Sequence, residues 1–321
     1  MPTYHLTHAS SYDAVRSGLY HLTTAEDSLA AQYNSFLLNA QIELALSTVK
    51  DYHYKLRTFI EYCHGAGLSK VTDITTDHVR GFILYMQQTH NPKSVNDYYK
   101  VARRFLSWLV EEERLIKNPM LRIKCPRVPE IIIKIFNSDH IHKILMLCED
   151  STRTGIRNKS MVLVLLDSGI RLSELARIQV NDIDIQHGII TVMGKGARQR
   201  VVGISKPTLK AVIRYYESRP GQHPQLWLTE EGKPITIAGI SQIFKALKRR
   251  AGFFDVRLSA HTFRHTSGTM ELLNGASERE VQLLLGHSTS AMTKHYTATI
   301  TSQAVVGRHK DFSPVLKMGL K

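Results

Sequence analysis

Cationic side chains, histidines and a tyrosine occur along the second half of the chain in an order that could act on a phosphodiester. They are Arg171, Lys195, His261, Arg264, His287 and Tyr296. A tyrosine hydroxyl can attack phosphorus and conserve the bond energy as a phosphotyrosine ester. Arginine suits the non-bridging oxygens because guanidinium is planar, forked and always charged. Lysine can protonate the departing oxygen. The set predicts backbone cleavage that needs no metal ion, cofactor or ATP.

Each of these residues lies in a distinctive local pattern. Arg171 belongs to G-I-R-L-S-E-L, and Lys195 to G-K-G between two segments rich in β-branched residues. Residues 261–266 read H-T-F-R-H-T, and residues 284–287 read L-L-G-H with Tyr296 shortly afterwards. In this order the patterns resemble the tyrosine recombinase (phage-type integrase) family over residues near 36–305. Several motifs in the right order are far more specific than any one of them.

The resemblance implies a role for each charged position and for the tyrosine. Arg171 and Arg264 would hold the scissile phosphate. Lys195 would be the general acid toward the 5′ oxygen, and Tyr296 would form the 3′-phosphotyrosine link. The resemblance also implies that the enzyme acts on double-stranded DNA.

The histidines and one carboxylate complete the implied site. His261 and His287 would hydrogen-bond the phosphate or assist proton transfer, and Glu174 would support Arg171 or its helix. The hairpin departs from the commonest family pattern, with Arg198 in place of a lysine and Gly203 in place of a proline. We expect only local effects from these departures.

Each residue taken alone also has an ordinary structural explanation. Arg171 could simply pair with Glu174 three positions further on. Lys195 could be an exposed turn residue, His287 could be a neighbour of a helix end, and Tyr296 could be a packing tyrosine. The joint pattern, rather than any single residue, favours an active site.

The charge balance agrees with a polyanionic partner. Lys and Arg number 42 against 28 Asp and Glu, and residues 1–36 are slightly acidic, so the basic excess lies in the rest of the chain. Such an excess favours nucleic acid over a generically basic surface or an anionic membrane. The three cysteines form no C-x-x-C pair, which predicts a reducing, cytoplasmic setting. No apolar stretch is long enough to cross a bilayer.

Periodicity predicts a mainly α fold with a small β-sheet. Apolar residues at helical spacing indicate a small helical domain, whose third helix is predicted to begin at Ser94. The family resemblance implies that this is a core-binding (SAM-like) domain. A proline-containing basic segment indicates a linker to a mixed α/β catalytic domain with a β-hairpin around Lys195. The predicted parts are an N-terminal extension at 1–35, the helical domain at 36–117, the linker at 118–136, the catalytic domain at 137–305 and a C-terminal tail at 306–321.

The two domains are predicted to clamp DNA. Candidate contacts are Lys93, Ser94, Lys100, Arg103, Arg104, Arg198 and Arg200. A charged helix face is more often simply solvated. His140 and His142 lack further ligands nearby, so no metal site is expected there.

Three functions stay open on the sequence. The first is a site-specific recombinase that forms a tetramer on two DNA sites. The second is a topoisomerase of type IB character, and the third is a DNA-binding protein without catalysis. Within the first, the acidic N-terminal extension favours an integrase or transposon recombinase of a mobile element over an Xer-type enzyme of chromosome resolution. Accessory proteins cannot be read from the sequence.

Overall fold

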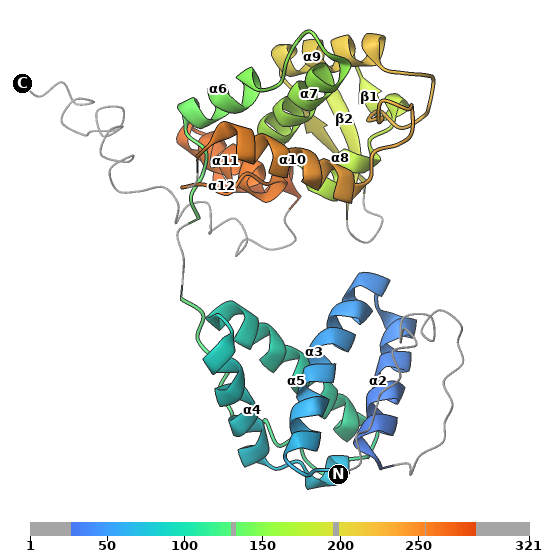
Figure 1. Ribbon diagram of the computed structural model, residues 1–321, viewed down its shortest axis with the longest axis vertical. Helices are drawn as coiled ribbons and strands as arrows, with labels where there is room; N and C mark the ends of the chain where they lie inside the picture. The colour runs from blue at the N-terminus through green and yellow to red at the C-terminus, as the bar shows by residue number, and fades with distance from the viewer. Residues whose placement is uncertain (1–26, 130–132, 195–198, 254, 287–321) are drawn as a thin grey trace, which may run out of the picture. The chain divides into compact units, whose positions relative to one another are not determined.

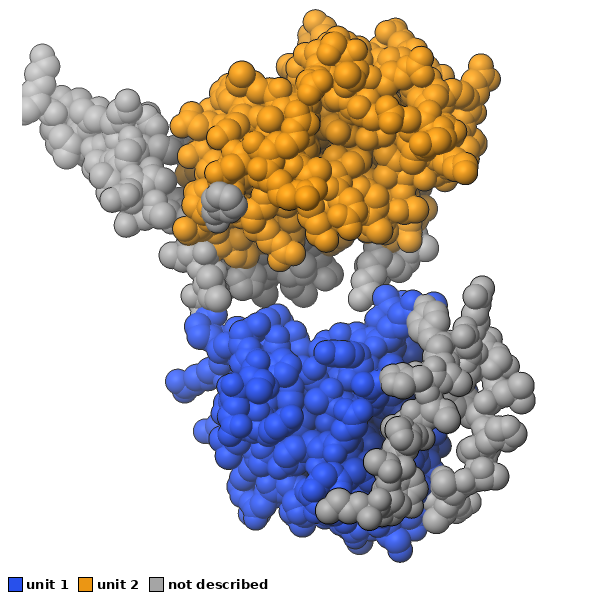
Figure 2. Space-filling model, viewed as in Figure 1, with its two compact units in different colours: residues 1–130 blue, residues 131–321 orange. Residues whose placement is uncertain are grey.

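The computed structural model describes residues 27–129, 133–194, 199–253 and 255–286. The chain divides into two compact units, residues 1–130 and residues 131–321 (Figure 2). Each unit has its own buried apolar core.

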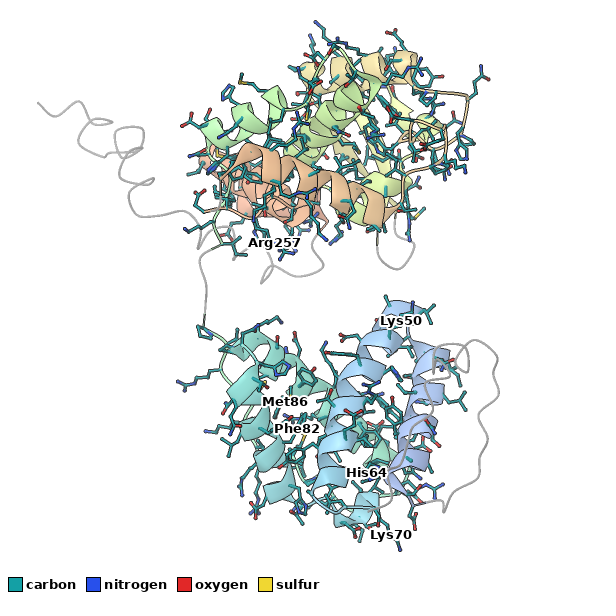
Figure 3. The ribbon with its side chains drawn as sticks, viewed as in Figure 1. Lys50, His64, Lys70, Phe82, Met86 and Arg257 are labelled. Carbon is teal, nitrogen blue, oxygen red and sulfur yellow. The ribbon has the colours of Figure 1, made fainter. Side chains whose placement is uncertain are left out.

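The described part of unit 1 is helical. Its elements are α2 (Leu29–Glu43), α3 (Leu46–Gly65), η1 (Val71–Asp73), α4 (Thr76–Thr89) and α5 (Pro92–Glu111). Phe82 and Met86 of α4 lie inside this helical unit (Figure 3), where both side chains are buried. Their spacing of one helical turn explains how a single face of α4 reaches the core.

The predicted start of α5 at Ser94 is wrong. Asn91 is the N-cap, and its side-chain oxygen accepts a hydrogen bond from the Ser94 backbone N–H at 2.9 Å. Pro92 follows at the first helical position, where its missing N–H costs nothing and its fixed φ suits a helix. The Asn-Pro pair therefore begins the helix before Ser94.

Two predicted boundaries of the helical domain fall within ordered structure. Residue 36 lies inside α2, which begins after the Ser28 N-cap. Beyond α5, Asn118 donates to Ser107 at 2.8 Å and Tyr99 donates to the Ile123 carbonyl at 2.7 Å. These bonds attach the first part of the predicted linker to α5.

Unit 2 combines helices with a three-stranded sheet of order β1-β2-β3. Its elements are α6 (Ser138–Met146), α7 (Arg153–Ser168), α8 (Leu172–Arg177), η2 (Val180–Asp182), β1 (Ile183–Asp184), β2 (Ile189–Met193), β3 (Gln199–Gly203), α9 (Lys206–Ser218), α10 (Ile237–Ala251), α11 (Ala260–Leu273) and α12 (Glu278–Leu285). The prediction of a mainly α fold with a small sheet is confirmed.

The central element of unit 2 is α7, which packs against both α9 and α11 (Figure 1). The β2–β3 hairpin is antiparallel, and the directly paired residues Ile190 and Val202 are both buried. Because their side chains share the core face, a one-residue slip of either strand would turn its buried side chain away from the core. The register at the base of the hairpin is thereby fixed.

No helix in the described ranges is long and apolar enough to cross a membrane.

Candidate active site

The turn between α7 and α8 places Arg171. Gly169 ends α7 with φ of +58°, a left-handed conformation that favours glycine. A Cβ at this position would lie 2.3 Å from a methyl carbon of Leu285 and 3.0 Å from the Ser267 hydroxyl oxygen. The close approach of α11 and α12 to this turn therefore requires glycine, and the chain turns there so that Arg171 becomes the N-cap of α8.

Arg171 is held at this turn by Glu174. The Arg171 backbone N–H donates to Glu174 Oε2 at 2.8 Å, and its guanidinium Nη1 donates to Oε1 at 2.9 Å. Nη2 donates to the Gly286 carbonyl at 3.2 Å. About a third of the Arg171 side chain is exposed, so it is oriented by the protein while still open to a ligand.

Arg264 approaches the same turn from α11. Its side chain is buried, with Nη1 donating to the Gly169 carbonyl and Nη2 to the Leu285 carbonyl, each at 2.7 Å. The adjacent carbonyls of Leu285 and Gly286 thus receive Arg264 and Arg171 respectively. Two guanidiniums from separate elements converge on the end of α12.

Both arginines line an open groove of about 850 Å³ in unit 2. His261, on the first turn of α11, lines it too. So do two exposed basic residues outside the sequence motifs, Lys134 and Arg257. Figure 3 labels Arg257 on unit 2. The positive charge of these side chains suits the groove to a negatively charged phosphate backbone.

His261 is poised as a neutral imidazole. Partial desolvation of the ring by the surrounding protein lowers its pKa, and the positive charges of Arg264 and Arg257 lower it further. Its Nε2 shares a hydrogen bond of 2.8 Å with Nε2 of His265, whose side chain is buried. At neutral pH the ring can therefore accept a proton or hydrogen-bond a phosphate oxygen.

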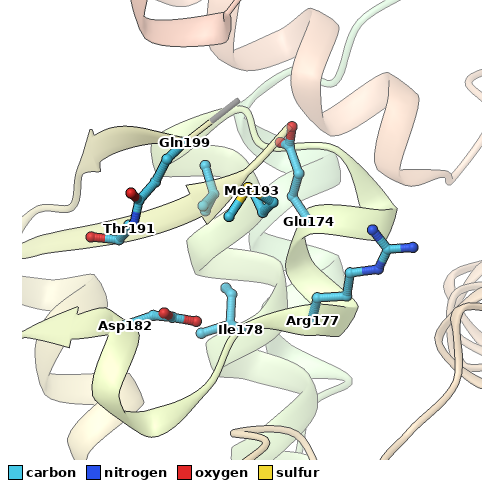
Figure 4. Close-up of a pocket in the computed structure, with 8 residues that line it drawn as sticks. Glu174, Arg177, Ile178, Asp182, Thr191, Met193 and Gln199 are labelled. Atoms are coloured by element: carbon cyan, nitrogen blue, oxygen red, sulfur yellow. The ribbon is translucent and has the colours of Figure 1, made fainter. Parts of the chain in front are cut away.

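Glu174 also binds the hairpin. Arg200 on β3 donates from Nη1 to Oε1 at 2.7 Å and from Nη2 to Oε2 at 2.9 Å. Burial works to raise the pKa of Glu174, but the hydrogen bonds from Arg200 and Arg171 outweigh it and hold that pKa below its usual value. Glu174 rises from α8 beside the hairpin residues Met193 and Gln199 (Figure 4).

Comparison with known proteins decides the family. A model of the "Phage integrase family" matches residues 134–302, more than half of the chain. The chain belongs to the phage integrase family. A model of the "Phage integrase, N-terminal SAM-like domain" matches residues 31–113. The chain is thus a tyrosine recombinase, of an enzyme family that cleaves and rejoins DNA at specific sites.

Curated relatives align over most of their length. A tyrosine recombinase XerD of Listeria monocytogenes is 29% identical over 280 residues, which cover 84% of this chain and 94% of the relative. A tyrosine recombinase XerC of Leptospira interrogans is 28% identical over 281 residues, which cover 85% and 90%.

Solved structures share the fold. A lambda integrase dimer bound to a COC′ core site gives a TM-score of 0.70 at 17% identity, covering 86% of this chain and 97% of that one. XerH recombinase in a post-cleavage complex with a palindromic difH substrate gives 0.69 at 18% identity, covering 88% and 84%.

The predicted catalytic set is only partly within the described residues of this tyrosine recombinase. Arg171, His261 and Arg264 lie together at the groove. Lys195, Arg198, His287 and Tyr296 lie outside the described residues. In the described ranges, no group of three or more His, Cys, Asp or Glu side chains could hold a metal ion.

The DNA contacts predicted in unit 1 all lie on α5. They are Lys93, Ser94, Lys100, Arg103 and Arg104. Lys93 pairs with Asp97 at 3.1 Å, and Arg104 pairs with Glu111 at 3.4 Å. Exposed ion pairs of this kind are worth only about 0–1 kcal/mol, so a phosphate could replace either carboxylate. DNA contact by α5 stays a prediction.

Lys134 and Arg257 could have been found from their positions in the sequence. Lys134 lies at the end of the basic linker, and Arg257 lies just before the H-T-F-R-H-T motif. Basic residues that flank an anion-binding motif are natural candidates for neighbouring phosphates. What the sequence could not show is that both reach one groove.

Proposed function

We propose that this recombinase cuts DNA through a covalent 3′-phosphotyrosine at Tyr296 and rejoins it to a second DNA end. The observation that carries the proposal is the convergence of Arg171, Arg264 and His261 on one basic groove. Guanidiniums fixed there would stabilise negative charge that develops on the phosphate, without reorganisation during the reaction.

The proposed step uses each residue once. The Tyr296 oxygen bonds to phosphorus as the bond from phosphorus to the 5′ oxygen breaks. Lys195 gives a proton to that 5′ oxygen, and the neutral ring of His261 can take the proton from the tyrosine. Arg171 and Arg264 bind the non-bridging oxygens, and we assign His287 to the same phosphate. Attack by a 5′ hydroxyl on the phosphotyrosine reverses the step and reseals DNA.

Sequencing of the DNA trapped on the protein tests this proposal. Denaturation during reaction should leave a covalent complex whose DNA has a free 5′ hydroxyl and a protein-blocked 3′ end. We expect reads to end at one phosphate within one short site. A spread of unrelated ends, or a protein-blocked 5′ end, would contradict site-specific cleavage by this route.

Two biological roles fit such an enzyme, and the same reads separate them. We propose recombination of a mobile element, for which reads would map to the ends or the joined circle of the element. An Xer-type role in the chromosome is favoured by the XerD and XerC relatives, which align over at least 90% of their own length. In that case the reads would map to a single chromosomal site.

Cleavage is expected to be independent of divalent metal. The proposed positive charge comes from arginine and lysine side chains, which remain fixed without added ions. Formation of the covalent complex in EDTA should match that in Mg²⁺ at equal ionic strength. A strict Mg²⁺ requirement would point to a nuclease-type mechanism.

The segment after Tyr296 is proposed to join subunits. Residues 297–321 lie outside the described residues, and their sequence combines a short apolar pattern with basic residues. So short a segment cannot bury an apolar face alone, and docking on a neighbour in a head-to-tail ring would join four subunits on two sites. In free solution we expect a monomer.

Truncation after Gln303 tests that assembly. Binding to one site, measured by mobility shift, should be retained, whereas the two-site complex and recombination should be lost. Recombination of two sites at the full-length rate would show that the tail does not join the subunits.

A further inference from the structure

The side chain of Arg200 is committed to the interior of unit 2. It is 16% exposed and lies against Glu174, whose side chain is 2% exposed. Nη1 and Nη2 bind the two carboxylate oxygens of Glu174, and Nε points to the Leu284 carbonyl at 3.4 Å. Three donor nitrogens of the guanidinium thus face partners within the protein, although the sequence suggested a DNA contact.

Glu174 joins Arg200 to Arg171. Oε1 accepts from both guanidiniums, and Oε2 accepts from Arg200 and from the backbone N–H of Arg171. These four bonds fill the acceptor capacity of a carboxylate, which is about four. Because the carboxylate is buried, losing the two bonds from Arg200 would leave its negative charge with only the two hydrogen bonds from Arg171. The Glu174 side chain could then rotate relative to Arg171.

Arg200 also lies against the end of α12. Gly286 has φ of +65°, and a Cβ there would lie 2.9 Å from both Cδ and Nε of Arg200. The Gly286 carbonyl accepts from Arg171. The Arg200 side chain therefore bridges β3, α8 and the peptide that precedes His287.

We propose that Arg200 is a positioning residue for strand cleavage, which acts through Glu174 on Arg171. It ties β3 to the turn that carries Arg171, so that the Arg171 guanidinium keeps a fixed position at the groove. The inference rests on the proposed function. A misplacement of about 1 Å at a reacting group can cost about 10²-fold in rate.

Arg200→Lys and Arg200→Met separate positioning from DNA contact. Lysine keeps the charge that a phosphate would bind but cannot bridge both carboxylate oxygens. Single-turnover cleavage would be measured on a nicked duplex that carries the site recovered by sequencing, together with Kd as a function of salt. We expect both variants to cleave about 10²-fold more slowly at saturating DNA. The Kd and its salt dependence should match the wild type.

Controls come from the same unit and from the partner carboxylate. Arg214 pairs with Asp150 at 3.5 Å on the surface and does not line the groove, so Arg214→Met should leave the cleavage rate unchanged. Glu174→Gln should slow cleavage, and adding Arg200→Met to it should cause little further loss. Non-additivity of this kind marks residues that act as one unit.

Two results would overturn the inference. The first is a lower DNA affinity together with an unchanged cleavage rate at saturating DNA. In that case the plot of log binding constant against log salt concentration should also become shallower by about 0.9, which marks loss of a phosphate contact. The second is a joint loss of DNA affinity, cleavage rate and thermal stability in Arg200→Lys, which marks a purely structural role. Failure of the wild type to cleave would instead overturn the proposed function, on which the inference depends.

Discussion

Tyr296→Phe should abolish the covalent complex with DNA while leaving DNA affinity unchanged. The substitution removes only the hydroxyl oxygen, which is the proposed nucleophile, and retains the ring. Without that oxygen no phosphotyrosine ester can form, so the loss should be complete rather than partial. The covalent complex would be measured on denaturing gels, and affinity by mobility shift of the same duplex.

Tyr216→Phe supplies a matched control. Tyr216 lies half-exposed on α9, with Arg219 stacked 4.9 Å from its ring centre, a contact that phenylalanine preserves. This variant should form the covalent complex as the wild type does. A protease-sensitive link to DNA that persists in Tyr296→Phe would show that another residue is the nucleophile.

Arg171→Ala and Arg264→Ala should each reduce the cleavage rate by about 10²–10³-fold, or about 3–4 kcal/mol, as for loss of one preorganised donor. Binding should change far less, because the additional negative charge that these residues stabilise develops in the transition state. Rate at saturating DNA and Kd, measured separately, distinguish the two effects.

The two arginines differ in what else they stabilise. Arg264 is buried and supplies donors to the Gly169 and Leu285 carbonyls, so its removal should also lower the free energy of unfolding by about 1–3 kcal/mol. Arg171 is more exposed and gives the cleaner test. Equal losses of affinity and rate in Arg171→Ala would mark it as an ordinary phosphate contact.

Local sequence signals predicted much of the fold. The β-hairpin expected around Lys195 is present, and its two antiparallel strands are β2 and β3. The two segments are rich in β-branched residues, and the G-K-G sequence between them indicates a turn. The start of α5 differs from the prediction because Ser94 is a good capping residue in isolation, whereas Asn91 followed by Pro92 is the stronger signal.

The residues of the site could be predicted from the sequence, but the contacts between them could not. The motifs selected Arg171, His261 and Arg264, and the resemblance to a family supplied their roles. Neither could show that Arg200 binds Glu174, because that bond joins β3 to α8 through the tertiary fold. Basic residues near a motif look alike in a sequence, and only their partners distinguish a DNA contact from an internal support.

Mass spectrometry of the protein after reaction with DNA tests the central claim most directly. The complex would be digested with nuclease and then with protease, and the peptide that carries the nucleotide remnant would be sequenced. We predict one modified residue, Tyr296, linked to a 3′ phosphate. A remnant on any other residue, or a link to a 5′ phosphate, would contradict the account.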